Sequence, residues 1–229
     1  MFLDRFLDLV FPPSCLSCRR RTKSNEVVCG NCLAAIPLNR TLFCGKCGAR
    51  LAEGRKICHR DFPYVLGAAT CYSNAAVKNL IHALKFKYVR GAAKPLGDLL
   101  AGYAEALPLR LEKFTVIPLP LHARRLRERG FNQSELIAGF FAKRLDLPLE
   151  TEWLERAKHA KPQSETKNLA ERKENIRGSF VVKNTTNVSG KNIILVDDVT
   201  TSGATFYEAA LVLKSAGARK IIALAAARA

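Results

Sequence analysis

The chain has 229 residues, of which 48% are hydrophobic and 25% are charged, as in a soluble globular protein with one substantial core and a small additional module. Lysine and arginine number 37 against 20 acidic residues, so the formal net charge of +17 predicts an anionic partner: a nucleic acid, a polyphosphate or an acidic membrane surface. No hydrophobic run reaches the length of a transmembrane segment, which excludes an integral membrane helix.

The first predicted element is a short amphipathic helix at residues 2–10. Phe2, Phe6 and Leu9 lie on one side of it, and Pro12-Pro13 ends it. The segment lacks the basic start and the cleavage site of a secretory signal, so we expect a cytoplasmic protein. We expect the helix to pack against the next module. The alternative is contact with a lipid surface, which would place the protein peripherally at the inner face of the membrane.

Seven of the eight cysteines lie in the first quarter of the chain, mostly as C-x-x-C pairs. Without an export signal this spacing indicates metal binding rather than disulfides. Two such pairs supply four thiolates for one tetrahedral zinc site. The first predicted zinc site is formed by Cys15, Cys18, Cys29 and Cys32.

A second zinc site is predicted from Cys44, Cys47 and Cys58, which leave one position open. Asp61 is the candidate for it, because it follows Cys58 at the spacing of another pair. His59, or no protein ligand, is the alternative. Sequential pairing of the C-x-x-C motifs is the simplest scheme, and interleaved pairing remains open from spacing alone. Either scheme gives a closed, structural site on which the folding of this module depends.

The join to a larger domain is predicted at Phe62-Pro63, which gives domains at 1–62 and 63–229. In the larger domain, strand and helix patterns alternate, which predicts an α/β fold with a parallel sheet flanked by helices. We expect Cys71 to be a small core residue of the first strand. Strands are expected at 65–72, 114–118, 179–182, 193–196 and 220–227, and helices at 74–87, 95–107, 132–144 and from 206 to Gly217.

Two segments of this domain are strongly basic. The first carries Arg124, Arg125, Arg127 and Arg129, which are well placed to hold polyphosphate oxygens; a solvated basic helix face is the alternative. The second, residues 156–178, is polar and basic. It is typical either of a loop that closes over a phosphate-rich ligand or of an ordinary surface loop.

The stretch from Ile193 to Thr205 carries the strongest chemical signal. A buried strand ends in Asp197 and Asp198, and a hydroxyl-rich turn and a helix follow. In open α/β sheets, ligands bind at the carboxyl ends of the strands. The turn offers backbone N–H groups, hydroxyls and a helix N-terminus to a phosphate, whereas the acids suit neighbouring hydroxyls, directly or through a divalent cation. These residues predict a site for a sugar phosphate.

This stretch resembles the phosphoribosyl-pyrophosphate (PRPP) signature of type I phosphoribosyltransferases. By that resemblance Asp197 and Asp198 hold the ribose hydroxyls, with Mg²⁺ accompanying PRPP. The 5′-phosphate is wrapped by Thr201, Ser202, Gly203, Ala204 and Thr205.

Nearly the whole chain resembles the ComF family, in which a double zinc ribbon precedes such a domain. Besides the cysteine pairs and the PRPP signature, the resemblance is carried by Leu84-Lys85-Phe86, Arg129-Gly130-Phe131-Asn132-Gln133, Gln163 and Asn175-x-Arg177-Gly178-x-Phe180. Asp61 stands where relatives carry the last cysteine of the second ribbon.

The resemblance implies a role in natural competence, in which incoming single-stranded DNA passes into the cytoplasm. Single-stranded DNA, a ComFA-like ATPase and recombination mediator proteins are then the expected partners. It also implies that the four arginines lie at the pyrophosphate end of PRPP. The alternatives are an active phosphoribosyltransferase with an unknown acceptor, and a zinc-ribbon adaptor whose second domain senses PRPP.

Overall fold

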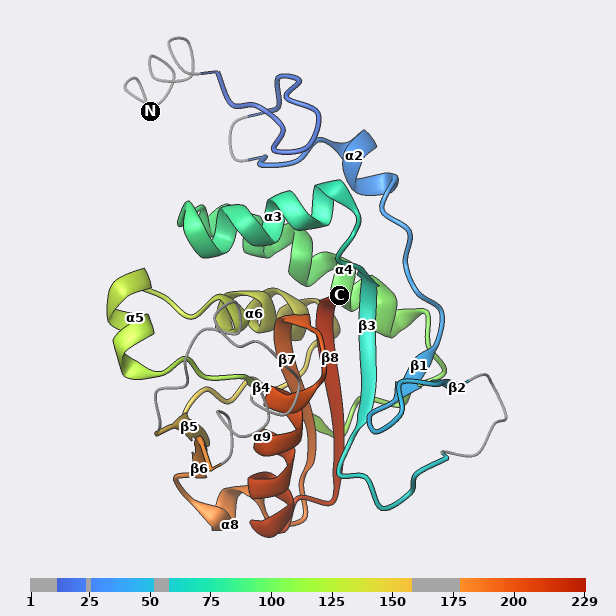
Figure 1. Ribbon diagram of the computed structural model, residues 1–229, viewed down its shortest axis with the longest axis vertical. Helices are drawn as coiled ribbons and strands as arrows, with labels where there is room; N and C mark the ends of the chain where they lie inside the picture. The colour runs from blue at the N-terminus through green and yellow to red at the C-terminus, as the bar shows by residue number, and fades with distance from the viewer. Residues whose placement is uncertain (1–11, 24–25, 52–57, 158–177) are drawn as a thin grey trace.

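The computed structural model describes residues 12–23, 26–51, 58–157 and 178–229 (Figure 1). The amphipathic helix expected at 2–10 lies outside these residues, as do residues 158–177 of the basic segment 156–178. In the described part of the chain, no helix is long and apolar enough to cross a membrane.

Among its described residues, the N-terminal part contains the short helix α2 (Gly30–Ala34) and the short strands β1 (Leu42–Cys44) and β2 (Arg50–Leu51). The rest of the chain alternates strands with helices, as the sequence predicts. Its elements are β3 (Val65–Cys71), α3 (Ala75–Phe86), a 3-10 turn (Arg90–Ala92), α4 (Ala93–Glu105), β4 (Phe114–Pro118), α5 (Ala123–Arg129), α6 (Gln133–Leu145), β5 (Leu154–Arg156), β6 (Phe180–Val182), α8 (Thr185–Val188), β7 (Asn192–Thr200), α9 (Ala204–Ser215) and β8 (Lys220–Arg228).

The main sheet has the strand order β2-β1-β3-β8-β7-β4, and β5 pairs with β6 in a separate two-stranded sheet. Strands β3, β8, β7 and β4 are parallel, whereas β1 and β2 continue the sheet in antiparallel sense. The predicted α/β fold with a parallel sheet is therefore confirmed.

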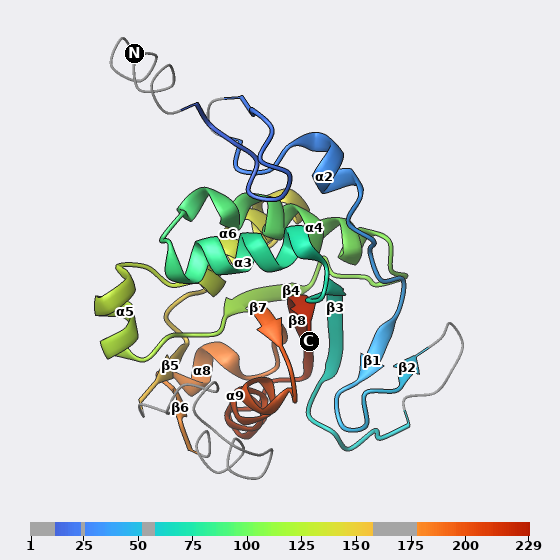
Figure 2. The same cartoon turned by 45° about the horizontal axis from the view of Figure 1, so that its top comes forward.

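Helices cover both faces of the sheet: α3, α4 and α6 lie over one face and α9 over the other (Figures 1 and 2). Along β7, Ile194 and Val196 pack toward the first layer, while Ile193 and Leu195 pack toward α9. A strand buried on both faces needs apolar residues at consecutive positions, which explains the uninterrupted hydrophobic run at 193–196.

Side-chain caps define where the helices beside the site begin. The Asn74 side chain accepts hydrogen bonds from two backbone N–H groups at the start of α3, and Asn132 accepts one at the start of α6. Such caps stabilise a helix by ~1 kcal/mol. Gly130, in the left-handed conformation with φ of 71°, ends α5 and lets the chain turn directly into α6.

The structure differs from the sequence-based expectations at three places. Strand β7 continues through both acids to Thr200 rather than ending before them. Cys71 is exposed, because it is the last residue of β3 and emerges at the edge of the sheet. The N-terminal module is hydrogen-bonded into the main sheet, with Phe43 opposite Leu66 and Cys44 opposite Val65, so a continuous sheet crosses the join expected at residues 62–63.

Candidate functional site

The acidic pair lies at the carboxyl edge of the sheet, where the parallel strands β3, β4, β7 and β8 end. The loops that follow these strands therefore surround the same edge. Lys85 at the end of α3, Ser134 at the start of α6 and the turn before α9 approach the pair from different elements. This convergence produces a polar, charged site on a hydrophobic sheet.

Asp198 is almost completely buried, with 2% of its surface exposed. Its Oδ1 accepts the Val199 N–H at 2.6 Å, and its Oδ2 lies 2.9 Å from the Lys85 Nζ. The geometry of this second contact is that of a close ion pair rather than a hydrogen bond. A buried carboxylate needs such a partner, because an uncompensated charge in the interior costs several kcal/mol, on the order of 3–5 when one partner is removed.

Asp197 is half-buried and is held by two donors. Its Oδ1 accepts the Ser134 hydroxyl at 2.7 Å and the Asp198 N–H at 2.9 Å. Burial, and then the neighbouring Asp198 charge, raise the pKa of Asp197 to about 7, although Lys85 and the Ser134 hydroxyl act in the opposite direction. The Asp197 carboxyl is therefore less acidic than an exposed aspartate.

The phosphate turn follows β7 directly and leads into α9. Gly203 adopts φ of 74°, and a Cβ at this position would lie 2.5 Å from the Tyr64 hydroxyl oxygen. That hydroxyl donates to the Gly203 carbonyl at 3.1 Å. The Tyr64 hydroxyl therefore fixes the turn by this hydrogen bond. Glycine suits position 203, because it has no Cβ to contact that hydroxyl and adopts the positive φ without strain.

Other residues of the turn offer donors toward solvent. Thr201 is exposed, and Ser202 and Thr205 are partly exposed, whereas Gly203 and Ala204 are buried as backbone at the start of the twelve-residue helix α9. The Ser202 hydroxyl accepts the Ala204 N–H at 3.4 Å. Hydroxyls and a helix N-terminus beside a carboxylate pair fit the phosphate and the sugar hydroxyls of one ligand.

The structure divides the four predicted arginines into two groups. Arg129 is half-buried and donates to the Gln133 Oε1 at 2.6 Å; burial lowers its pKa, while attraction from Asp198 raises it. Arg125 repels the positive charge of Arg129 and therefore lies on the same side. Arg124 instead pairs with Glu128 on its own helix at 2.9 Å, and Arg127 is exposed. Of the four, Arg129 is the one that interacts with an acid of the pair, and Arg125 lies close enough to Arg129 and Arg156 to repel both.

Arg156 is a further residue of this site, which the sequence identifies only as the first residue of the basic segment 156–178. It ends β5, and its guanidinium lies 5.4 Å from the centre of the Phe180 ring. Its Nε is buried and has no hydrogen-bond partner among the described residues. Burial lowers its pKa, repulsion from Arg125 lowers it further, and attraction from Asp197 raises it. A buried donor without a partner beside a second guanidinium is a site that an anion would complete.

Lys85 and Ser134 are two further residues whose roles were not predicted. By sequence, Lys85 lies near the end of the helix expected at 74–87, and Ser134 lies in the first turn of the helix expected at 132–144. In the structure Asn132 caps α6, which leaves the Ser134 hydroxyl free to bind Asp197. No local pattern identifies these contacts, because each joins segments far apart in the chain.

The first cysteine cluster consists of Cys15, Cys18, Cys29 and Cys32, whose ligand atoms all lie within 4.8 Å of one another. The Cys18 and Cys29 sulfurs are 3.7 Å apart. A tetrahedral Zn–S distance of about 2.3 Å places ligand sulfurs ~3.8 Å apart, so the cluster has the size of a zinc site. Burial raises the pKa of Cys15, but three backbone N–H donors outweigh it and lower the pKa to about 6, which favours the thiolate that binds zinc.

The second cluster consists of Cys44, Cys47, Cys58 and His59. The His59 Nδ1 lies 3.4 Å from the Cys44 sulfur, and the Cys47 and Cys58 sulfurs are 3.5 Å apart. Asp61, the candidate for the fourth position, is not part of the cluster; His59 takes its place. A Cys₃His set is an established type of structural zinc site. The clusters also follow the sequential pairing of motifs.

The second cluster packs against the part of the chain that supports the phosphate turn. A Cβ on Gly45 would lie 2.6 Å from the Phe62 ring, and that ring stacks at 5.2 Å on Tyr207 of α9. On the other side, Arg228 of β8 lies 4.9 Å from the Phe43 ring centre and donates to the Gly48 carbonyl at 3.4 Å. The cluster is thus integrated into the main domain rather than carried on a linker.

Comparison with known protein families matches residues 6–60 to the double zinc ribbon domain and residues 132–229 to the phosphoribosyl transferase domain. Over 209 residues the chain is 29% identical to the competence protein ComFC of Bacillus subtilis, covering 85% of this chain and 81% of that protein. The chain has the domain organisation of the ComF family.

Other relatives of the chain carry related names. The DNA utilization protein YhgH of Escherichia coli K12 is 28% identical over 213 residues, which cover 90% of this chain and 86% of that protein. Competence protein F of Haemophilus influenzae is 25% identical over 225 residues, which cover 94% and 96%. The similarity therefore extends over both parts of the chain.

Proposed function

We propose that the chain binds PRPP at the carboxyl edge of its sheet and acts in the handling of single-stranded DNA that enters the cytoplasm during natural competence. The PRPP assignment depends on one observation: three features lie together at the carboxyl edge of the sheet. These are the Asp197–Asp198 pair, the hydroxyl turn at 201–205 and the guanidinium groups of Arg125, Arg129 and Arg156. A pentose with a 5′-phosphate and a 1-pyrophosphate has a group for each of them.

Each feature has a separate task in this proposal. The turn donates N–H and hydroxyl groups to the 5′-phosphate, and the acids accept hydrogen bonds from the ribose hydroxyls. The guanidiniums bind the pyrophosphate oxygens, and the buried Arg156 Nε gains its missing partner. Mg²⁺, which accompanies PRPP, would supply further neutralisation of the pyrophosphate charge. Arg124 and Arg127 contribute long-range attraction only.

The cysteine clusters act as structural zinc sites in this proposal, because all four positions of each are occupied by protein ligands. We assign residues 1–62 to the zinc-ribbon module and 63–229 to the PRPP-binding domain. A cytoplasmic location, with peripheral contact at the inner face of the membrane, suits a role at the point of DNA entry. Relatives named for competence and DNA utilization support this role, with a ComFA-like ATPase and recombination mediators as proposed partners.

Titration calorimetry with PRPP in the presence of Mg²⁺ tests the binding function. We expect one PRPP per chain, with weaker binding of ribose 5-phosphate and of pyrophosphate, since each fills only part of the site. Equal affinity for PRPP and for ribose 5-phosphate would contradict the assignment of the guanidiniums. The site would then take a simple sugar phosphate.

An active phosphoribosyltransferase is the second candidate, favoured by the match to the phosphoribosyl transferase domain. Transfer would break the bond between ribose C1 and pyrophosphate, and the arginines would stabilise the leaving pyrophosphate. Release of pyrophosphate over a panel of nucleobases and amines separates the two functions. If none is released while PRPP binds, the domain is a PRPP sensor, and the zinc ribbons then serve as its adaptor to partners.

A further inference from the structure

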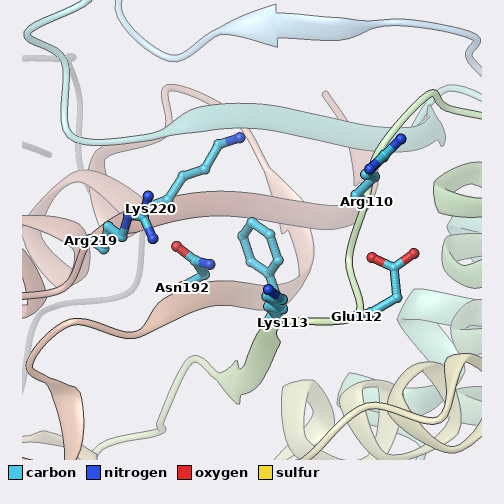
Figure 3. Close-up of a pocket in the computed structure, with 7 residues that line it drawn as sticks. Arg110, Glu112, Lys113, Asn192, Arg219 and Lys220 are labelled. Carbon is cyan, nitrogen blue, oxygen red and sulfur yellow. The ribbon is translucent and has the colours of Figure 1, made fainter.

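A second positively charged site lies at the opposite edge of the sheet, where the parallel strands begin. It is a cavity of about 760 Å³, shown in Figure 3, and four cations surround it: Arg110, Lys113, Arg219 and Lys220. We call it the amino-edge pocket. Neither the PRPP site nor the zinc clusters include any of its residues.

The floor of the pocket is formed by the first residues of three neighbouring strands. Phe114 of β4 pairs with Asn192 of β7, and Asn192 pairs with Lys220 of β8. Paired residues in a sheet present their side chains on the same face, so these three form one row across the pocket. From Asn192 to Thr200 the strand β7 spans nine residues, which places the pocket ~26 Å from the end of the strand at the PRPP site.

The charges of this pocket are not compensated by the described parts of the protein. Within residues 12–23, 26–51, 58–157 and 178–229, no ion pair joins any of the four cations to an acid. Glu112 is the single acidic residue among those that line the pocket. The row of cations extends beyond the pocket: Lys214 donates to the Arg219 carbonyl at 2.8 Å, and the Lys191 carbonyl accepts the Arg219 N–H at 2.8 Å.

The type of anion follows from how the pocket is built. The four cations are exposed, and none of the residues that line the pocket is a glycine or belongs to a helix. Exposed lysines and arginines spread along an edge suit successive phosphates of a chain, which they bind by releasing counterions, rather than one compact polyphosphate. Phe114 is 4% exposed, and therefore offers no ring face on which a base could stack.

We propose that the amino-edge pocket binds the phosphodiester backbone of single-stranded nucleic acid, without reading its bases. This inference deepens the proposed function, on which it rests for the identity of the nucleic acid as incoming DNA. It also separates the two ligands: the strand and PRPP occupy opposite edges of one sheet and bind at the same time.

The test compares two variants with the same change in net charge. Arg219→Glu/Lys220→Glu reverses two exposed cations of the pocket, and Arg50→Glu/Lys78→Glu reverses two exposed cations elsewhere. Fluorescence anisotropy with a labelled oligothymidylate, measured over a series of salt concentrations, gives affinity and salt dependence. Neither pair of side chains is buried, so circular dichroism should show both variants folded.

We expect the pocket variant to lose two phosphate contacts. The slope of log affinity against log salt should fall by about 1.4, and affinity at about 0.1 M salt should drop roughly 25-fold relative to the control variant. An abasic strand of equal length should bind like the oligothymidylate. Equal affinity of the two double variants for the oligonucleotide would overturn the proposal. A DNA duplex that binds as tightly as the single strand, and loses affinity equally in the Arg219→Glu/Lys220→Glu variant, would also overturn it.

Two further arms keep this proposal separate from the PRPP assignment. Saturating Mg²⁺–PRPP should leave oligonucleotide affinity unchanged, and Asp197→Asn/Asp198→Asn should lose PRPP while it retains the oligonucleotide. Inorganic pyrophosphate serves as the probe for a compact anion. If the pocket variant loses pyrophosphate but binds the oligonucleotide like the control, the pocket is a small-anion site and the proposal is wrong.

Discussion

Removal of the Lys85 ammonium is the perturbation that most sharply tests how the acidic pair is stabilised. Lys85→Met keeps the length of the side chain and deletes the charge 2.9 Å from the Asp198 Oδ2. Breaking a buried ion pair from one side costs about 3–5 kcal/mol, because the remaining charge loses its partner. The Lys85 side chain is 19% exposed, so water replaces part of the lost stabilisation. We therefore expect about 3 kcal/mol of lost stability near pH 8.

The loss should depend on pH with a definite sign. Lys85 lowers the pKa of Asp197, so its removal moves that pKa further above the value of about 7. A carboxyl group whose pKa is raised by folding destabilises the folded state once it must ionise there. This loss of stability begins as pH rises above the pKa in the unfolded chain, about 3.9, and is complete above the pKa in the folded state. The part of the loss that comes from Asp197 should therefore be absent near pH 5 and largest at pH 8.

Urea unfolding of Lys85→Met at both pH values provides the measurement, with Lys87→Met as the matched control, since Lys87 is exposed at the end of the same helix. Adding Asp198→Asn to the Lys85→Met variant should recover most of the stability at pH 8. If Lys85→Met is no less stable than Lys87→Met at pH 8, the ion pair does not stabilise the site and the reasoning is refuted.

Three other predictions test separate parts of the site. Arg156→Met should weaken PRPP binding about tenfold, the effect of one charged hydrogen bond, whereas Arg124→Met should change it less than threefold in the same titration. Gly203→Ala should cost about 1–2 kcal/mol in urea unfolding, and Tyr64→Phe in the same chain should restore part of it; no restoration would show that Tyr64 does not hold the turn. Elemental analysis should find about one zinc fewer per chain in His59→Ala, while Asp61→Ala retains the wild-type content; the reverse result would return Asp61 to the cluster.

The parts of the site that sequence reasoning predicted are those carried by contiguous segments. The acidic pair lies in the last part of one strand and the turn follows that strand directly, so the strand pattern alone places them at the carboxyl edge. The same holds for the C-x-x-C pairs, whose spacing brings two sulfurs together in any fold. The helix ends were predicted because Asn74, Asn132 and Gly217 act on their immediate neighbours.

The parts that were missed depend on contacts between distant segments. Lys85, Ser134 and Arg156 reach the acids from three different elements, and nothing in their local sequence distinguishes them from surface residues. Arg124 is different, because the spacing of Arg124 and Glu128 by four positions on a helix was a readable signal of an ion pair that competes with ligand binding.

The choice between His59 and Asp61 shows a limit of motif spacing. Spacing favoured Asp61, because the other ligands come in pairs separated by two residues. The structure selects His59, whose Nδ1 reaches the Cys44 sulfur although it is adjacent to Cys58 in the chain. The integration of β1 and β2 into the main sheet was equally hidden, because strands of two or three residues carry too few positions for a periodic pattern.

The most direct test of the central claim is PRPP titration of the Asp197→Asn/Asp198→Asn variant in the presence of Mg²⁺. Two hydrogen bonds to charged acceptors contribute about 1.5–3 kcal/mol each, so affinity should fall at least about a hundredfold, while urea unfolding shows that the fold is retained. PRPP affinity equal to that of the wild type would contradict the account, because the acids would then have no part in binding the ligand.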